Sequence, residues 1–270
     1  MATPMNEQPM GERRFGRVNM LGLQTLILRE VQRFWAVKTQ TLLAPVVTAI
    51  LFLMVFSLAF GERRGEDLSG AYIAFLAPGI LMMSVIQNAF ANTSSSLLSA
   101  KIQGNIVDTL MPPLSAGELT IGYTLGGVMR GMVVAVTVSA VVFPFIGLGV
   151  AHPIWALTFV CVSATLMSLL GLLAAIQAQK FDQMSMVTNF VVTPLSFLSG
   201  TFYSIEVLPG WLQAVSHANP FFYMIDGVRF AVLGQSDVSP VLGLTVIVAA
   251  DVALGLLAWN WFRTGYRLKP

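Results

Sequence analysis

The sequence predicts an all-α polytopic membrane protein built as a single transmembrane domain. Hydrophobic residues make up 56% of the chain and charged residues only 10%. The mean hydropathy of +0.75 lies outside the range of ordinary soluble domains. Crossing the ~30 Å hydrocarbon core of a bilayer takes about 20 residues. Six stretches reach that length, and we expect six transmembrane helices near residues 41–60, 71–98, 122–143, 154–176, 185–201 and 240–262.

The N-terminal region precedes these spans. Residues 1–19 are largely polar and predict a flexible cytoplasmic tail, and no apolar segment with a signal-peptide cleavage site follows them. The transmembrane domain then covers residues 20–270. Residues 20–38 predict an amphipathic helix lying in the membrane interface, because Leu23, Ile27 and Phe34 share one helical face.

One residue of this interfacial helix departs from the pattern. Glu30 falls within the apolar arc, where a carboxylate without a partner is costly. One explanation is that it reaches the headgroups or pairs with a neighbouring basic residue such as Arg33 or Lys38. The other is that it docks against a cytoplasmic partner. The residues alone leave both explanations open.

The distribution of basic residues orients the chain. Eleven of the 15 lysines and arginines fall in segments that the six spans place on one side of the membrane. The exceptions outside the spans are Arg63, Arg64 and Arg229. Because positive loops remain in the cytoplasm, both termini are expected to be cytoplasmic.

The second span carries a polar stripe at helical spacing. Its members step by three or four residues along one face and are Ser84, Asn88, Asn92, Ser95 and Ser99. The helix then continues into the charged, amphipathic segment Lys101–Leu110 and stops at Pro112 and Pro113. Such a continuation suggests a part that moves when something soluble pushes on it.

The fifth span carries a second polar stripe with the same spacing. Its members are Ser185, Asn189, Thr193, Ser196 and Gly200. The two polar faces are able to meet across a cavity, and this predicts a translocation path lined by Ser84, Asn88, Asn92, Asn189, Thr193 and Ser196. The alternative is hydrogen bonding between helices of a dry bundle.

Small residues mark the third span. Gly122 and Gly126, and Gly127 and Gly131, form two G-x-x-x-G spacings that indicate tight helix packing. Such spacings are common in membrane helices and carry no chemistry.

The segment between the fifth and sixth spans is too polar for a clean span and too apolar for a free loop. Its aromatic residues favour short re-entrant helices at the outer interface, and they are Phe202, Tyr203, Trp211, Phe221, Phe222 and Tyr223.

Two ionisable residues lie deep within the expected spans. Arg130 in the third span either extends to the cytoplasmic headgroups or faces the interior. Asp251 in the sixth span is either a protonated hydrogen-bonding residue or a proton relay. The one cysteine, Cys161, sits in an apolar run and is expected to serve packing.

The sequence contains no motif for catalysis. It has no G-x-x-x-x-G-K-[ST] phosphate loop, no H-E-x-x-H and no C-x-x-C, and no nucleophile with a base can be assembled. We therefore expect no catalytic residue, no metal site, no cofactor bound by this chain and no nucleic-acid partner. The energy for any transport must come from another chain or from an ion gradient.

Three segments resemble the membrane subunit of bacterial type-2 ABC exporters, of the drug and lipid or glycan export branch. They are APGILMMSVIQNAFANTSSSLLSAKIQGNIVDTLMPPLSAGE, GYTLGGVMRG and KFDQMSMVTNFVVTPLSFLSGTFYSIEVLPGWLQAVSHANPFFYMIDGVRF. The more specific part is the S-x-x-N-P block at Ser216–Pro220, followed by Arg229.

This resemblance implies an ATP-driven export permease of the bacterial inner membrane. Two copies of a separate ABC ATPase would bind ATP and magnesium, and a second permease copy, forming a homodimer among the membrane lipids, would complete the path. The resemblance puts the coupling element on Lys101–Leu110 and the N-terminal contact on Arg29 and Glu30. The expected coupling residues are thus Arg29, Glu30, Lys101, Ile102, Asn105 and Asp108.

Two other functions remain open at this level. One is a gradient-driven secondary transporter that uses Asp251, which would be favoured by an inverted repeat; we find none. The other is a structural scaffold, which explains neither polar stripe. Hydroxyl and amide stripes without a row of charges suit an amphipathic or hydrophobic cargo such as a drug, a lipid or a lipid-linked glycan.

Overall fold

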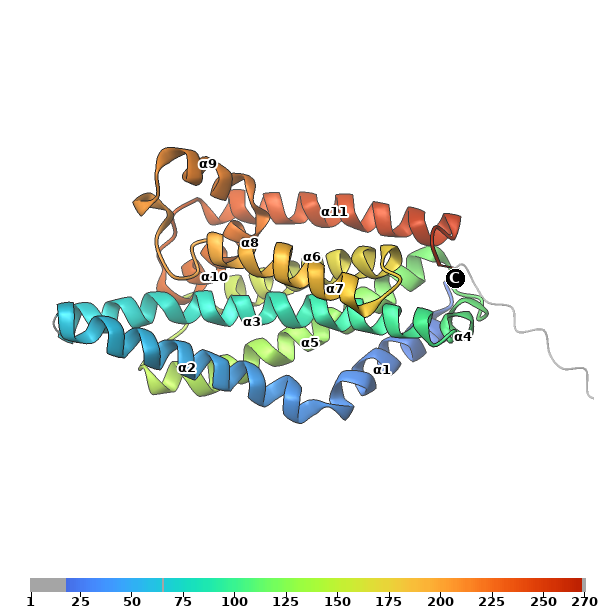
Figure 1. The fold of residues 1–270 in the computed structure, drawn as a ribbon, viewed down its shortest axis with the longest axis horizontal. Helices are drawn as coiled ribbons and strands as arrows, with labels where there is room; N and C mark the ends of the chain where they lie inside the picture. Colours follow the sequence, from blue (N-terminus) through green and yellow to red (C-terminus); the bar gives the residue numbers. More distant parts are fainter. Residues whose placement is uncertain (1–17, 65, 269–270) are drawn as a thin grey trace, which may run out of the picture.

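The computed structural model describes residues 18–64 and 66–268 of the chain, and the secondary structure of these residues is entirely helical (Figure 1). In chain order the elements are α1 (Met20–Ala36), α2 (Lys38–Arg64), α3 (Glu66–Ile102), α4 (Ile106–Leu110), α5 (Ala116–Phe145), α6 (Pro153–Gln177), α7 (Phe181–Val187), the π-helix η1 (Thr188–Val192), α8 (Thr193–Leu198), the 3₁₀-helix η2 (Ile205–Val207), α9 (Gly210–Ala218), α10 (Pro220–Leu233) and α11 (Pro240–Thr264).

The all-helical membrane class is confirmed. Five helical segments of the described chain are long and apolar enough to cross a membrane: Lys38–Ala59, Gly70–Ile102, Ala116–Phe145, Pro153–Gln177 and Pro240–Thr264. They correspond to the first, second, third, fourth and sixth expected spans. The number of six spans, the cytoplasmic termini and the interfacial position of α1 remain predictions. The expected flexible tail falls mostly on residues 1–17, outside the described residues.

The expected fifth span is helical but interrupted. The chain runs from α7 through η1 into α8, so the helix widens over Thr188–Val192. The N–H of Thr193 donates to the carbonyl of Thr188, five residues back. Pro194 follows at once, and a proline lacks the N–H that an α-helix requires and crowds the preceding turn. The wide turn accommodates this proline.

The centre of the bundle is α3, which packs against α2, α5, α6 and α10. The most apolar windows of α3 and α6 are each 72% buried, whereas those of α2 and α11 are 22% and 17% buried. The two central helices therefore form the core, and α2 and α11 present most of their surface outward. Figure 1 shows α1 leaving the bundle at an angle to α2, at the same end as α4 and the C-terminus. The break is at Val37, whose backbone is not helical.

The two G-x-x-x-G spacings of α5 serve two different neighbours. A Cβ at Gly126 would lie 2.5 Å from the Cβ of Glu30, and Gly122 is equally close to Leu26, so this pair receives α1. Gly127 and Gly131 face Ser168 and Ala164 of α6. The predicted tight packing is confirmed, and the sequence pattern did not show that the two spacings serve different helices.

The end opposite α1 is closed by η2, α9 and α10. Asn219 begins α10, its side chain accepting from the N–H of Phe221 at 3.1 Å and donating to Ser199 Oγ at 2.8 Å. The buried Arg229 donates to the carbonyl of Gly200 at 2.6 Å, and its guanidinium lies 3.8 Å from the ring centre of Phe75. The short helices expected here are present, and their re-entry into the membrane remains a prediction.

The contact between α3 and α6 gives a stability prediction. An alanine Cβ at Gly171 would lie 2.5 Å from the carbonyl oxygen of Phe90, a backbone atom that cannot rotate away. We expect Gly171→Ala to lower the free energy of unfolding by about 1–3 kcal/mol, because overpacking outweighs the better helix propensity of alanine. The midpoint of thermal unfolding in detergent, compared with that of wild type, measures this loss of stability. The control is Gly70→Ala, where nothing lies within 4 Å; equal midpoints for the two variants would contradict the prediction.

Candidate functional site

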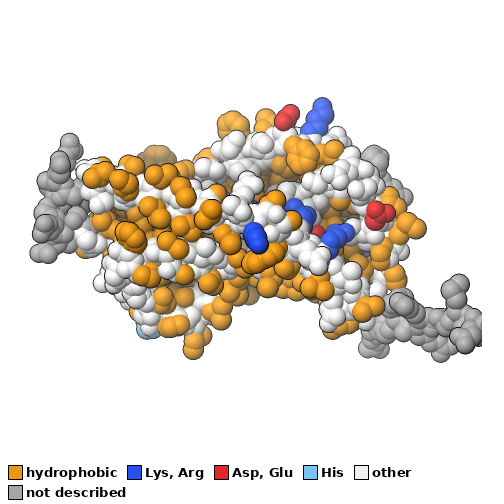
Figure 2. Space-filling view, turned by 90° about the horizontal axis from the view of Figure 1, so that it is seen from below, with side chains coloured by type: hydrophobic (Ala, Val, Ile, Leu, Met, Phe, Trp, Pro, Cys, Tyr) orange, Lys and Arg blue, Asp and Glu red, His pale blue; other side chains and the backbone are white. Residues whose placement is uncertain are grey.

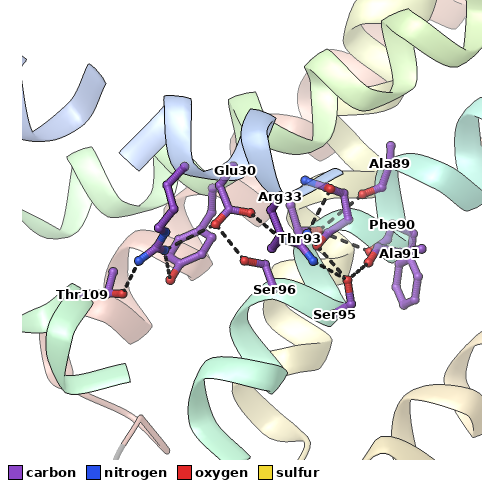
Figure 3. Close-up of polar contacts among 12 residues, drawn as sticks. Glu30, Arg33, Ala89, Phe90, Ala91, Thr93, Ser95, Ser96 and Thr109 are labelled. Carbon is purple, nitrogen blue, oxygen red and sulfur yellow. Dashed lines mark hydrogen bonds and ion pairs between the residues drawn. The ribbon is translucent and has the colours of Figure 1, made fainter. Parts of the chain in front are cut away.

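The helix α1 is held to the bundle by a buried carboxylate. Glu30 is fully buried, and its Oε1 accepts from Ser96 Oγ of α3 at 2.7 Å (Figure 3). Arg29 Nη2 lies 3.3 Å from Oε1, and Arg33 Nε lies 3.5 Å from Oε2. Both arginines thus share one carboxylate. A pair removed from water in this way is stable only when further hydrogen bonds satisfy its atoms.

Arg29 also forms hydrogen bonds with α4 and α5. Its Nη1 donates to Thr109 Oγ1 of α4 at 2.8 Å, and its Nη2 donates to the hydroxyl of Tyr123 of α5 at 3.1 Å. Burial acts to lower the pKa of Arg29, but Tyr123 and Glu30 outweigh it, so the pKa is raised. The guanidinium therefore remains charged and joins α1, α4 and α5.

Arg33 joins α1 to α3. Its Nη1 donates to Ser95 Oγ at 3.1 Å, and its Nη2 donates to the backbone carbonyl and the side-chain oxygen of Asn92 at 2.5 and 3.0 Å. The side-chain oxygen of Asn92, expected on a translocation path, is therefore occupied by a contact within the chain.

The start of α1 is attached to the start of α5. The carboxylate of Glu118 accepts from the backbone N–H groups of Ser115, at 2.6 Å, and of Asn19. Ser115 Oγ accepts in return from the N–H of Glu118, which completes a capping box. Asn19 Nδ2 also donates to the carbonyl of Pro113 at 3.3 Å. The loop between α4 and α5 is thus held by Asn19 at Pro113 and by Glu118 at Ser115.

The segment around α4 presents an apolar surface. Ile102, Val107 and Leu110 are exposed and Met111 is 77% exposed, while Asn105 and Asp108 also face outward. A cavity of about 310 Å³ lies beside it, between α1 and α4, and Arg29, Asp108 and Thr109 are among its lining residues. Exposed apolar residues with an acidic neighbour form a surface suited to a protein partner.

The expected coupling residues thus occupy different positions. Ile102, Asn105 and Asp108 are exposed, and Arg29 is 45% exposed in its side chain. The side chain of Glu30 is fully buried and cannot contact a soluble partner directly. Of the two explanations for a carboxylate on the apolar face of this helix, the structure shows the pairing with Arg33. Lys101 Nζ donates to the carbonyls of Ala175, Ile176 and Ala178 at 3.1, 2.7 and 2.7 Å. It satisfies the carboxyl end of α6, where a cation is favourable.

The two expected polar stripes meet only in part. Ser95 of the first stripe shares a cavity with Ser185 and Asn189 of the second, whereas Ser84 and Asn88 lie elsewhere. Ser84 and Asn88 line a cavity between α2, α3 and α5. Asn189 lines a different cavity of about 250 Å³ with Ser94 and Ser95 of α3. Farther along α8, Thr193 is half-buried and Ser196 is fully buried.

The intramembrane charges have few partners. Arg130 donates from Nε and Nη2 to the side-chain oxygen of Asn88, at 3.2 and 3.0 Å. Oδ1 of Asp251 is buried and has no hydrogen-bond partner among the described residues. Within the same part of the chain, no group of three or more histidines, cysteines or acidic residues is placed to hold a metal ion.

Sequence reasoning missed several partners of this network. Ser96, Thr109 and Tyr123 complete the contacts of Glu30 and Arg29, and Ser94 lines the cavity of Asn189 together with Ser95, a member of the predicted stripe. The available signal was the pair of arginines beside Glu30, since two guanidinium groups need more acceptors than one carboxylate supplies. That signal does not identify where the acceptors lie.

Comparisons with known proteins agree on one family. The family model described as ABC-2 type transporter matches residues 22–233. The inner membrane transport permease YadH of Escherichia coli is 39% identical over 92% of this chain and 97% of its own length. The daunorubicin resistance ABC transporter permease protein DrrB1 of Streptomyces coeruleorubidus is 26% identical over 77% of this chain and 73% of its own. Nodulation protein J of Rhizobium leguminosarum is 23% identical, over 77% and 80%.

The buried carboxylate gives a prediction. Replacing Glu30 with alanine leaves two guanidinium groups without their shared counter-charge, so we expect the free energy of unfolding to fall by about 2–4 kcal/mol. We also expect α1 to become sensitive to trypsin. Thermal unfolding and limited proteolysis measure both effects. Gln32→Ala, at an exposed position of the same helix, is the control. The network is not what holds α1 if both variants behave alike.

Proposed function

The chain belongs to the ABC-2 type transporter family and is a membrane permease subunit of an ABC transporter; from this premise we propose that it is an exporter subunit of the bacterial inner membrane. A separate ABC ATPase subunit supplies the energy, with two copies per complex that bind ATP and magnesium. The permease itself has no hydrolytic role. The name of the relative YadH supports the inner-membrane location.

One observation carries the coupling proposal: α4 offers an exposed surface and is joined through Arg29 to α1 and α5. A force applied to α4 by a soluble subunit reaches α1 directly, and Glu30 passes it to α3. Transmission between sites requires such a contiguous, packed connection. We propose that Asp108 and the exposed apolar residues around it contact the ATPase, and that Glu30 and Lys101 hold the surface in place.

The cargo is proposed to be amphipathic or hydrophobic. The cavity lined by Ser94, Ser95, Ser185, Thr188 and Asn189 contains hydroxyl and amide groups and no ionised side chain. Such a wall suits a molecule that carries little charge through the membrane. The name of the relative DrrB1, which refers to daunorubicin resistance, is consistent with a drug-like cargo, and a lipid or lipid-linked glycan fits the same chemistry.

We further propose that six spans cross the membrane and that two copies form a homodimer. The interrupted helix from α7 to α8 serves as the fifth span, with both termini in the cytoplasm. It has few contacts with the remainder of its own chain, and Phe190 on it is 77% exposed. A second copy facing this helix would enclose the polar cavity.

The alternative, a gradient-driven transporter built on Asp251, rests on the buried oxygen of that residue without a partner. Family membership favours the ATP-driven mechanism, because it supplies an energy source that needs no proton relay.

Reversing the charge on α4 tests the coupling surface. In proteoliposomes with the partner ATPase, we expect Asp108→Lys to keep membrane insertion but to reduce ATP-driven export of a lipophilic dye by about tenfold or more, because the variant replaces the carboxylate of the proposed contact with the opposite charge. The control is Glu206→Lys, an exposed acidic residue of η2 at the opposite end of the bundle. Normal export by Asp108→Lys would place the ATPase contact elsewhere.

Cysteine crosslinking tests the homodimer. In a Cys161→Ser background, we expect a cysteine at the exposed Asn189 to form disulfide-linked dimers in native membranes. A cysteine at the fully buried Ser196 should not react and serves as the control. If neither Asn189 nor other exposed positions of α7 and η1 crosslink, the proposed arrangement fails.

A further inference from the structure

A polar cavity of about 180 Å³ lies between α2, α3 and α5, within the apolar bundle. Its polar lining consists of Gln40, Thr48, Ser84, Gln87, Asn88 and Arg130. Gln40 is in the first turn of α2, next to the break at Val37 that separates α2 from α1. The cavity therefore lies toward the end of the bundle that carries α1 and α4.

No carboxylate of the described residues forms an ion pair with the arginine of this cavity. Arg130 makes both of its hydrogen bonds to one neutral acceptor, the side-chain oxygen of Asn88. The ion pairs of the described residues involve Glu30, Arg29 and Arg33, and none includes Arg130. Among the described residues, the charged side chain that affects Arg130 is Arg33, which is also a cation. A guanidinium at this depth favours an anionic partner, and three of its five N–H groups remain to bind one.

A separate groove lies farther along the same three helices. It has a volume of about 320 Å³, and its lining is apolar apart from Ser57 and includes Ile50, Leu53, Val142 and Phe145. Val142 lies twelve residues after Arg130 on α5, or roughly 18 Å at 1.5 Å per residue. That length is close to the roughly 15 Å of hydrocarbon in one leaflet of a bilayer.

We propose that this face binds an anionic phospholipid, with its phosphate drawn to Arg130 and an acyl chain extending along the apolar surface of the same helices toward the groove. The order of the two parts matches such a lipid, since the polar cavity is nearer the cytoplasmic end and the groove lies farther out. In Figure 2 basic side chains gather near the middle of one face of the molecule, and apolar side chains dominate the part farther from the α1 end. Arginine is suited to phosphate because its planar donors match two phosphate oxygens.

This inference goes beyond transport, because lipid binding requires neither the ATPase nor a cargo. Its failure would leave the proposed permease function untouched, and a failure of coupling at α4 would leave the lipid site untouched.

The experiment is native mass spectrometry of the purified full-length permease. The protein receives equal amounts of phosphatidylglycerol and phosphatidylcholine with identical acyl chains. We expect wild type to retain phosphatidylglycerol in preference. Arg130→Gln should reduce that preference about fivefold, the effect of one basic residue on an anionic lipid. Arg263→Gln removes one exposed positive charge from the end of α11 and should leave the preference unchanged.

A second variant covers the possibility that Arg130→Gln does not fold. Asn88→Asp places a carboxylate about 3 Å from the guanidinium, so Arg130 remains but its charge is already paired. We expect this folded variant to lose the preference as well. Glycerol 3-phosphate, which has the headgroup charge without a chain, should not displace the lipid at equal concentration.

Several results would overturn the proposal. They are equal retention of both lipids by wild type, equal losses in Arg130→Gln and Arg263→Gln, an unchanged preference in Asn88→Asp, or displacement by glycerol 3-phosphate. A loss of dimers in Arg130→Gln without a change in bound lipid would assign the groove to a second copy instead.

Discussion

The burial of Glu30 is the constraint on which the end of this structure that carries α1 and α4 depends. A carboxylate without access to water must find cations and donors, and here Arg29, Arg33 and Ser96 supply them. The close approach of α1 is possible because α5 presents Gly126 opposite Glu30. The glycine and the carboxylate are thus two parts of one contact, and α1 lies against α3 and α5 as a result.

From this contact the arrangement of α4 follows. Arg29 is already held by Glu30, so its remaining donors reach Thr109 and Tyr123 in a fixed direction. Glu118 and Asn19 hold the following loop, and Lys101 fixes the end of α3 to the carboxyl end of α6. A helix of five residues has little stability by itself. It is positioned by polar contacts from its neighbours, which makes it responsive to whatever binds its exposed side.

Local patterns in the sequence were sufficient for the helices and for the class of protein, because apolar length and 3.6-residue periodicity depend on neighbouring residues. The amphipathic α1 and the tight packing at the glycines were predictable, whereas the pairing of Glu30 with Arg33 was one of two explanations that the sequence left open. The partners of the polar stripes were not, since the rotation of α3 decides that Asn88 faces Arg130 whereas Ser95 faces α7. Pro194 was visible in the sequence, but the wide turn before it depends on how the chain relieves the crowding.

The distribution of polar groups also limits which faces of the bundle contact lipid. Hydroxyl and amide groups exposed to hydrocarbon are unfavourable, so the side with the exposed Ser185 and Asn189 favours water, cargo or another chain against it. α11 has the opposite character, because most of its surface is outward and apolar, with Leu256 60% exposed. The proposed homodimer would satisfy both faces, with lipid against α11 and a second copy against α7 and η1. A single copy in a bilayer would place the polar cavity next to hydrocarbon, and this cost is an argument for assembly on that side.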